Sequence, residues 1–318
     1  MVDERIKQYR IRERLGAGAM GHRHAAAVRT AGDRVTVVVD ADLARARALD
    51  ENALPFDSLT GALDGPEEID AAIIATPSFQ HLDQLTTLAA AGIPTLVEKP
   101  HRIPGQDPSP LRAAVADGAE VFVGMSTRHW PAYVELGRAV RDGELGELLT
   151  YTDRMAFALP DGALPAWYFD RSVSGGGVLV TNGVHALDRA RALLGPLTDV
   201  HATMRSVIPG HDTEDHAAVH FRAGGTSGAI ELLWAPYESL GTGLVITGTR
   251  GSACVGMDGS WRIVTAAGES SGDAIDIDTV PFLAQWRAFR SRVDGFGVDD
   301  LEPTLTLIES LYREASHG

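Results

Sequence analysis

Lysine is rare in this chain, and one of its two lysines stands where a proton could be moved. Of the 28 cationic side chains only Lys7 and Lys99 are lysines, and Lys99 lies between Glu98 and Pro100 at the end of an apolar run, residues 93–97. Arginine keeps its proton at any working pH, whereas a buried lysine loses its proton readily. Lys99 is therefore a candidate for proton transfer. The alternative is an exposed residue without chemistry, as we expect for Lys7.

A second group of residues could hold a cofactor that contains phosphate. Residues 16–21 match G-x-G-x-x-G, a turn whose glycines let the backbone approach a pyrophosphate at a helix N-terminus. Asp40 follows about 20 residues later, where a carboxylate accepts hydrogen bonds from an adenosine ribose. Asp40 and Asp42 would repel a 2'-phosphate and favour NAD over NADP, whereas Arg45 would favour the phosphate. A glycine-rich turn without a cofactor is the alternative.

The elements that would position these residues alternate over the first 125 residues. Short β-branched runs follow alanine- and leucine-rich stretches, which predicts a parallel sheet with crossover helices. We expect strands at residues 35–39, 69–75, 93–97 and 121–124, and helices at about residues 80–91 and 110–117. The segment that should form the first strand, residues 9–15, carries three charges in succession, which is unusual for a central parallel strand.

The pattern changes from about residue 151 onward. Longer runs such as residues 217–221 and 229–234 alternate with turns, which predicts an antiparallel sheet with one covered face. No segment has the composition of a flexible linker, so we place the domain boundary near Met125. The predicted domains are residues 1–125 and 126–318.

Aromatic residues recur at helical spacing near the end of the chain. Phe282, Trp286, Phe289 and Val293 would share one face of a helix. We expect this face in the core or at a subunit interface rather than at a ligand.

Composition limits the partners of the protein. A formal charge of −15 disfavours nucleic acid and anionic membranes, because the summed field repels phosphate. No apolar stretch approaches the roughly 18 residues of a membrane span, and the first residues lack the order of a secretory signal. We therefore expect a cytoplasmic protein. The single cysteine, Cys254, excludes an internal disulfide and a cysteine-based zinc site, and we expect it to fill the core.

Histidines and carboxylates crowd residues 211–220 and suggest a metal site. If residues 216–221 form a strand, His216 and His220 share a face but stand about 13 Å apart, too far for one ion. We therefore predict a turn that leads into a sheet, and no metal.

The motifs, taken in order, resemble those of the GFO/IDH/MocA family of NAD(P)-dependent oxidoreductases. They are the glycine turn, Thr76-Pro77 with His81, Glu98-Lys99-Pro100, and residues 175–188, which read GGGVLVTNGVHALD. The resemblance runs from about Leu15 to Asp188, and more loosely through Glu214-Asp215 and residues 248–251. It implies an α/β fold, with an N-terminal Rossmann domain built on a doubly wound parallel sheet. It also implies a C-terminal α+β domain with an open, mostly antiparallel sheet, an active site between the domains, and a homodimer or homotetramer formed through the sheet face.

The resemblance assigns catalytic roles to Lys99 and His185. In the family the lysine lies near the nicotinamide and the reacting hydroxyl, the peptide before its proline is often cis, and the histidine takes or returns the substrate proton. The candidate cofactor-binding residues are Gly16, Gly18, Met20, Gly21, Asp40, Thr76, Pro77, His81, Glu98, Lys99 and Trp167, with NAD as the expected cofactor. The candidate substrate-binding residues are Lys99, Arg128, His129, Tyr168, Thr181, Asn182 and His185, although His129 and Tyr168 could equally be packing residues.

One position departs from the family pattern. Four residues before the histidine the family commonly has an aspartate, which at this spacing could hold the tautomer of the histidine and raise its basicity. This chain has Thr181 there, so we expect His185 to be a weaker base. Asp188, one turn after His185, is either a substitute carboxylate or a solvated helix residue.

These residues together predict an oxidoreductase. It would transfer a hydride between nicotinamide and a secondary alcohol or ketone of a sugar, sugar derivative or cyclitol, with a small polyol or keto-sugar as its partner. Two alternatives stay open. Thr181 and the charged first strand suggest a dinucleotide-binding regulatory relative without turnover, and some relatives are NAD-dependent glycosidases.

Overall fold

The computed structural model describes residues 19–159, 164–208, 210–235, 237 and 239–315, and these residues form two compact units. The first unit comprises the described residues up to Ser126 together with Asp278–Glu302. The second comprises Thr127–Ile277 together with the described residues from Pro303 onward. The predicted boundary near Met125 assigned every later residue to the second domain, whereas the segment Asp278–Glu302 packs with the first unit.

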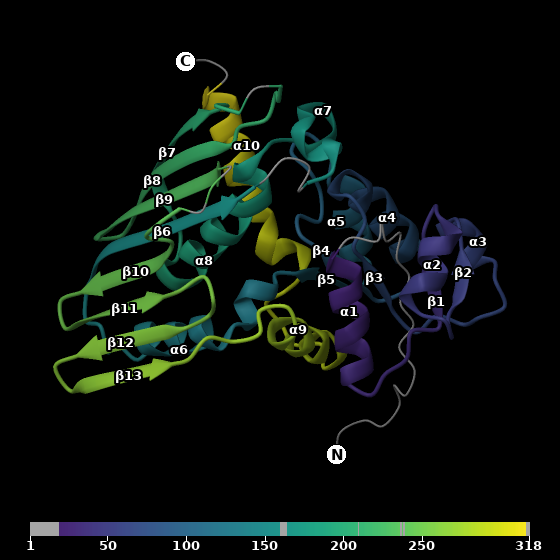
Figure 1. Ribbon diagram of the computed structural model, residues 1–318, viewed down its shortest axis with the longest axis horizontal. Helices are drawn as coiled ribbons and strands as arrows, with labels where there is room; N and C mark the ends of the chain where they lie inside the picture. The colour runs from purple at the N-terminus through teal and green to yellow at the C-terminus, as the bar shows by residue number, and fades with distance from the viewer. Residues whose placement is uncertain (1–18, 160–163, 209, 236, 238, 316–318) are drawn as a thin grey trace. The chain divides into compact units, whose positions relative to one another are not determined.

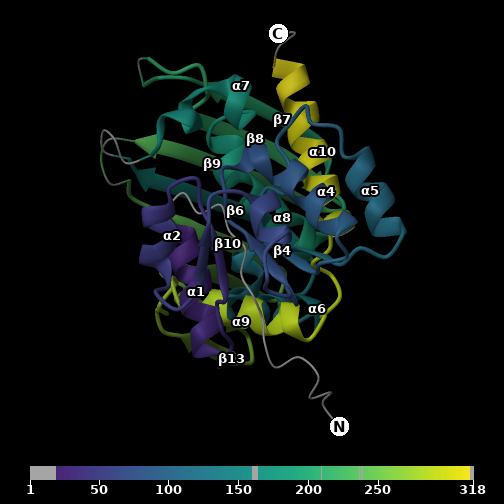
Figure 2. The same ribbon diagram turned by 90° about the vertical axis from the view of Figure 1, so that its right-hand side faces the viewer.

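Parallel strands with helical connections build the first unit (Figure 1). Its strands are β1 (Val37–Val39), β2 (Leu54–Phe56), β3 (Ala72–Ile74), β4 (Thr95–Glu98) and β5 (Val121–Gly124), and its helices are α1 (Ala19–Thr30), α2 (Leu43–Leu49), α3 (Leu59–Leu63), α4 (His81–Ala90), α5 (Ser109–Ala116) and α9 (Val280–Arg290). β1 pairs with β2, and β4 lies between β3 and β5, all in parallel. Helices α4 and α5 lie side by side (Figure 2). The expected parallel Rossmann-type sheet is therefore present, while the predicted first strand, residues 9–15, lies outside the described residues.

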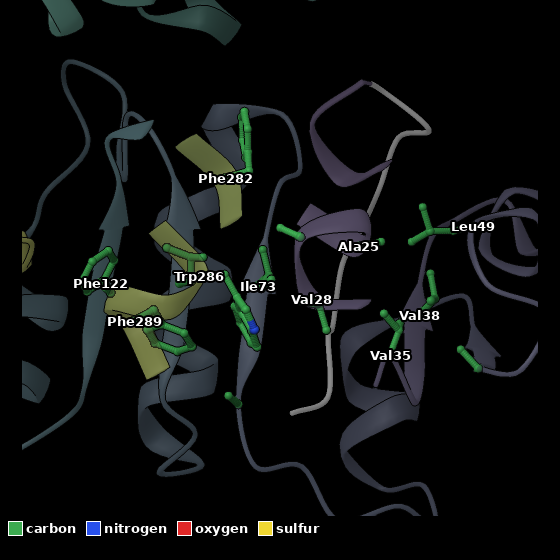
Figure 3. Packing of buried hydrophobic residues seen from close by; sticks show 14 of the residues in the cluster. Ala25, Val28, Val35, Val38, Leu49, Ile73, Phe122, Phe282, Trp286 and Phe289 are labelled. Carbon is green, nitrogen blue, oxygen red and sulfur yellow. The ribbon is translucent and has the colours of Figure 1, made fainter. Parts of the chain in front are cut away.

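Helix α9 returns to the first unit because its aromatic face belongs to that unit's core. Phe282, Trp286 and Phe289 are buried together with Ile73 of β3 and Phe122 of β5 (Figure 3). The expected aromatic face therefore lies in the core. Burial of its three large rings stabilises the first unit strongly.

Polar contacts fix the same helix, and its apolar face ends sooner than the sequence pattern predicted. The indole nitrogen of Trp286 donates to Asp33 at 2.8 Å, and Arg290 pairs with the same carboxylate at 3.0 Å. Val293 lies beyond the end of α9 and is 47% exposed, so it does not continue the buried face.

An eight-stranded sheet organises the second unit. Its order is β13 (Gly268–Gly272), β12 (Trp261–Thr265), β11 (Gly251–Val255), β10 (Gly243–Gly248), β6 (Leu148–Ala158), β9 (Thr226–Ala235), β8 (His216–Ala223) and β7 (Thr198–Arg205). β6 and β9 are parallel and the other neighbours are antiparallel, which confirms the mostly antiparallel sheet. The unit also contains α6 (Pro131–Arg141), α7 (Arg171–Ser174), a π-helical turn (Leu179–Gly183) and α8 (Val184–Leu194), and α8 packs on β6 and β9. Helix α10 (Val298–Ala315) gives its first residues to the first unit and its later residues to the second.

Two residue-level predictions for this sheet have different outcomes. Cys254 is exposed rather than buried, because it lies on β11 between Ala253 and Val255, which point to the covered face. The predicted strand at residues 216–221 lies within β8.

The described residues contain no group of three or more histidine, cysteine, aspartate or glutamate side chains arranged to hold a metal ion. In the same part of the chain, no helix has both the length and the apolarity to cross a bilayer.

Candidate active site

The glycine turn is described only at its helical end. Gly16 and Gly18 lie outside the described residues, whereas Met20 and Gly21 lie in the first turn of α1. Gly21 is buried, and the sulfur of Met20 accepts from Arg23 at 3.3 Å. The predicted phosphate-binding role of this turn stays a prediction.

Asp40 follows β1 and has a carboxylate oxygen that needs a donor. The residue is only 3% exposed, and its Oδ1 accepts from the backbone amide of Asp42 at 2.8 Å. Its Oδ2 is buried and has no hydrogen-bond partner within the described part of the chain. A buried carboxylate oxygen without a donor is costly. The two hydroxyls of an adenosine ribose would supply donors, so Asp40 fits the adenosine end of a dinucleotide.

His81 joins the loops that follow β3 and β4. Its Nε2 lies 2.8 Å from the carbonyl oxygen of Thr76, and its Nδ1 lies 2.7 Å from that of Pro100. Burial lowers the pKa of His81, while both carbonyls favour its protonated form. The hydroxyl of Thr76 donates to Gln84 at 2.8 Å. These candidate cofactor residues thus hold the two loops together, next to the cis peptide between Lys99 and Pro100.

Glu98 is the last residue of β4 and Lys99 follows it, and a histidine of α1 holds the carboxylate. The Nε2 of His24 lies 2.8 Å from Glu98 Oε1, and the backbone amide of Lys99 donates to Oε2 at 3.2 Å. Burial alone would raise the pKa of Glu98, but the bond from His24 and the charges of His24 and Lys99 lower it. Sequence reasoning missed His24. Its signal was a lone histidine on the apolar face of an alanine-rich helix.

Lys99 is half-buried, and its ammonium loses a proton more readily than that of an exposed lysine. Burial lowers the pKa of its ammonium, and the negative charge of Glu98 opposes this in part. A lysine in such a setting serves proton transfer better than an exposed one.

In the second unit a carboxylate anchors the glycine segment before α8. Glu214 Oε1 accepts from the backbone amides of Gly177 and Leu179, both at 3.0 Å, and from the hydroxyl of Tyr312 at 2.7 Å. A Cβ at Gly176 would overlap Tyr312, and one at Gly177 would overlap the backbone of Glu214. Glycine is therefore required at both positions, and the anchor sets where the helical segment begins.

The helical segment carries three of the substrate candidates. Thr181 and Asn182 are half-buried in the π-helical turn, and π turns often occur at functional sites. Asn182 accepts from the indole nitrogen of Trp234 at 2.8 Å. His185 is 9% exposed at the start of α8, and its Nδ1 lies 3.3 Å from the hydroxyl of Thr127.

Arg128 of the 3₁₀ turn Ser126–His129 and Asp188 of α8 form a bidentate ion pair. Arg128 Nε donates to Asp188 Oδ2 at 2.7 Å, and Nη2 bonds to Oδ1. Asp188 is 1% exposed, so the alternative of a solvated helix residue is wrong; the arginine offsets the cost of burying the carboxylate. Burial and then the charge of Arg128 lower the pKa of His129 to about 4, so its imidazole is neutral at pH 7.

Trp167 and Tyr168, both half-buried, stack on each other with ring centroids 3.9 Å apart.

Comparison with known proteins decides the family. The model of the oxidoreductase family with an NAD-binding Rossmann fold matches residues 15–124, and the GFO/IDH/MocA C-terminal domain model matches residues 133–254. The chain is 31% identical over 225 residues to the rhizopine catabolism protein MocA of Rhizobium meliloti, which is 69% of each chain. The chain belongs to the GFO/IDH/MocA family. The resemblance inferred from the motifs is therefore confirmed.

Two other known proteins share part of the sequence or the fold. The inositol 2-dehydrogenase of Rhizobium meliloti (strain 1021) is 34% identical over 186 residues, which are 57% of this chain and 54% of that protein. The chain thus spans about half the length of that relative. A levoglucosan dehydrogenase, solved in complex with NADH and levoglucosan, has a TM-score of 0.86 at 20% identity over 98% of each chain, which shows a common fold.

Proposed function

We propose that this family member is an NAD-dependent oxidoreductase that interconverts a secondary alcohol and a ketone on a sugar, a sugar derivative or a cyclitol. Family membership supports the reaction class, and the name of the inositol 2-dehydrogenase relative supports the substrate class. The relatives described above give no support to the regulatory or glycosidase alternatives.

Lys99 is the single observation that carries the proposal. A half-buried lysine with a lowered pKa follows directly after a strand of an NAD-binding fold, beside a carboxylate that His24 holds. The ammonium of Lys99 donates to the substrate oxygen and stabilises the negative charge that grows there during oxidation.

NAD, when bound, supplies the hydride acceptor for the substrate carbon. The pyrophosphate would be held by the glycine turn, namely Gly16, Gly18, Met20 and Gly21. Asp40 would accept hydrogen bonds from the adenosine ribose. The unsatisfied oxygen of Asp40 supports this assignment. A carboxylate there also disfavours a 2'-phosphate, so NADP is the poorer cofactor.

His185 exchanges the proton of the substrate hydroxyl. In the oxidative direction the substrate carbon loses a hydride, its oxygen loses a proton to His185, and a ketone forms; reduction reverses both transfers. Thr181, Asn182 and Tyr168 are the proposed polyol contacts. Arg128 and His129, in the 3₁₀ turn Ser126–His129, are further proposed contacts. The ion pair with Asp188 restricts how Arg128 can move.

A homo-oligomer and a cytoplasmic location belong to the proposal. Val245, Cys254 and Val264 lie exposed on the open face of the second unit's sheet, which supports association through that face. Light scattering that gives 33.8 kDa, the mass of one chain, would contradict the oligomer. Cell fractionation tests the location.

The decisive experiment is a substrate screen with a matched pair of lysine variants. NADH absorbance is followed across sugars, sugar phosphates, sugar nucleotides and cyclitols, with binding of NAD measured by calorimetry. We expect Lys99→Arg to lower kcat by about 100-fold or more while NAD still binds. Lys7→Arg, the same change at the other lysine, should retain full activity. Full activity in Lys99→Arg contradicts the role of the lysine, and failure of the wild type to bind NAD contradicts the function.

A further inference from the structure

We propose that Thr127 is a positioning residue that fixes which ring nitrogen of His185 carries the proton. The inference rests on the proposed function, in which His185 exchanges a proton with the substrate. Thr127 lies in the short 3₁₀ turn Ser126–His129, far from His185 in sequence, and was not among the site candidates.

The contact joins two buried groups. The hydroxyl oxygen of Thr127 lies 3.3 Å from Nδ1 of His185, and the two residues are 8% and 9% exposed. Water therefore competes little for either atom, and a bond in such surroundings holds its geometry better than one at the surface.

The role proposed for His185 decides the direction of this bond. A neutral imidazole has one nitrogen that donates and one that accepts. A base must keep its substrate-facing nitrogen without a proton. Because Nδ1 lies against Thr127, the nitrogen without a proton is Nε2. Nδ1 then carries the proton and donates it to a lone pair of the Thr127 hydroxyl.

The carboxylate nearest in sequence is held by an arginine. Asp188, one turn after His185, is bound at both oxygens by Arg128, which lies directly after Thr127 in the chain. The 3₁₀ turn thus gives an arginine to the carboxylate of α8 and a hydroxyl to its histidine. Burial lowers the pKa of Arg191, also on α8, and the charge of Asp188 opposes this in part.

Charged groups on the other elements that pack against α8 are matched as well. On β6, Asp153 pairs with Arg189 of α8 at 2.6 Å, and the guanidinium of Arg189 lies over the ring of Tyr133 on α6. On β9, Glu231 pairs with Arg154 at 2.9 Å. His129, at the end of the 3₁₀ turn, is neutral at pH 7, as argued above.

A hydroxyl acts differently from the aspartate common in the family. Either group selects the tautomer, but only a carboxylate adds a full negative charge that strongly raises the pKa of the histidine. Thr127 thus supplies orientation without a large gain in basicity, which agrees with the weaker base expected from Thr181.

Variants at Thr127 separate the hydroxyl from the rest of the side chain. Thr127→Val keeps the shape and removes the hydroxyl, whereas Thr127→Ser keeps the hydroxyl. Loss of an acceptor for Nδ1–H destabilises the imidazolium, so in Thr127→Val the pKa on the acid limb of the kcat profile should fall by about 0.5 unit, and kcat by about tenfold. Thr127→Ser should retain the wild-type profile, and so should Ser126→Ala, which removes the neighbouring hydroxyl of the same turn.

A spectroscopic measurement on the wild type needs neither a substrate nor a variant that folds poorly. Long-range ¹⁵N–¹H correlation spectra of protein labelled in its histidine rings distinguish protonated from bare nitrogens, and His185→Asn assigns the signal. We expect a protonated Nδ1 in His185. A protonated Nε2, an unshifted profile in Thr127→Val, or an equal shift in Thr127→Ser would each overturn the proposal. If no polyol is oxidised by the wild type, the proposed function fails, and the spectrum still decides the tautomer.

Discussion

Removing the carboxylate of Glu214 should release the segment that leads into α8. One oxygen of this side chain accepts from two backbone amides of that segment and from Tyr312 of α10. In Glu214→Ala all three donors lose their acceptor in a buried place. Of its bonds to residue 214, the start of the glycine segment then keeps only the backbone bond from Val178 to the carbonyl oxygen, at 2.8 Å.

The structure sets the size of the effect. Hydrogen bonds to a charged group contribute about 1.5–3 kcal/mol each, and three that share one acceptor contribute less than their sum. We therefore expect Glu214→Ala to lower the free energy of unfolding by about 4 kcal/mol. Tyr312→Phe removes one of the three bonds and should cost about 2 kcal/mol. Burial and then the charge of Glu214 raise the pKa of Tyr312 far above its usual value, so its hydroxyl donates at every practical pH.

Urea unfolding followed by tryptophan fluorescence measures these changes. A double-mutant cycle of Glu214→Gln with Tyr312→Phe should give a coupling energy of about 1–2 kcal/mol, because the two groups share a bond. Glu269→Ala is the matched control, since its carboxylate forms an exposed pair with Arg262 and its loss should leave the midpoint close to the wild-type value. A cost below about 1 kcal/mol for Glu214→Ala, or strict additivity in the cycle, would refute the anchor.

Two further predictions concern the first unit. Asp40→Ala should weaken NAD binding in calorimetry by about tenfold or more, because the ribose loses a charged acceptor, and an unchanged affinity would remove Asp40 from the cofactor site. Burial alone would raise the pKa of Glu302, but the bonds from His101 and Arg102 lower it from 4.5 to about 2. A depressed pKa gives stability that is complete above pH 4.5 and lost as the pH falls toward 2, so the wild-type urea midpoint should fall more steeply over this range than that of Glu302→Gln. Parallel falls in the two proteins would contradict this.

Local patterns were sufficient where neighbours in the chain fix the outcome. The strand predicted at residues 121–124 coincides with β5, and the helix predicted at about residues 80–91 corresponds to α4. β4 ends at Glu98, directly before Lys99, as the apolar run indicated, because the same residues that favour a strand also show where it stops. The motif order was equally informative about the family.

Contacts between distant residues could not be derived in this way. His24 holds Glu98 from 74 positions away, and Thr127 lies against His185 from 58 positions away. The residue types alone leave many partners open to each of these groups. Which face of β11 is covered likewise depends on what packs against the sheet, and Cys254 lies on the other, exposed face.

The sequence by itself determined most element types and the family, and it supplied the candidate residues for proton transfer and ribose binding, because these depend on periodicity and side-chain chemistry. Tertiary structure alone decided that the aromatic helix α9 packs with the first unit, that Asp188 is neutralised by Arg128, and that a hydroxyl meets His185. Burial and hydrogen bonding require that each polar group find a partner in three dimensions, and only the folded chain brings those partners together.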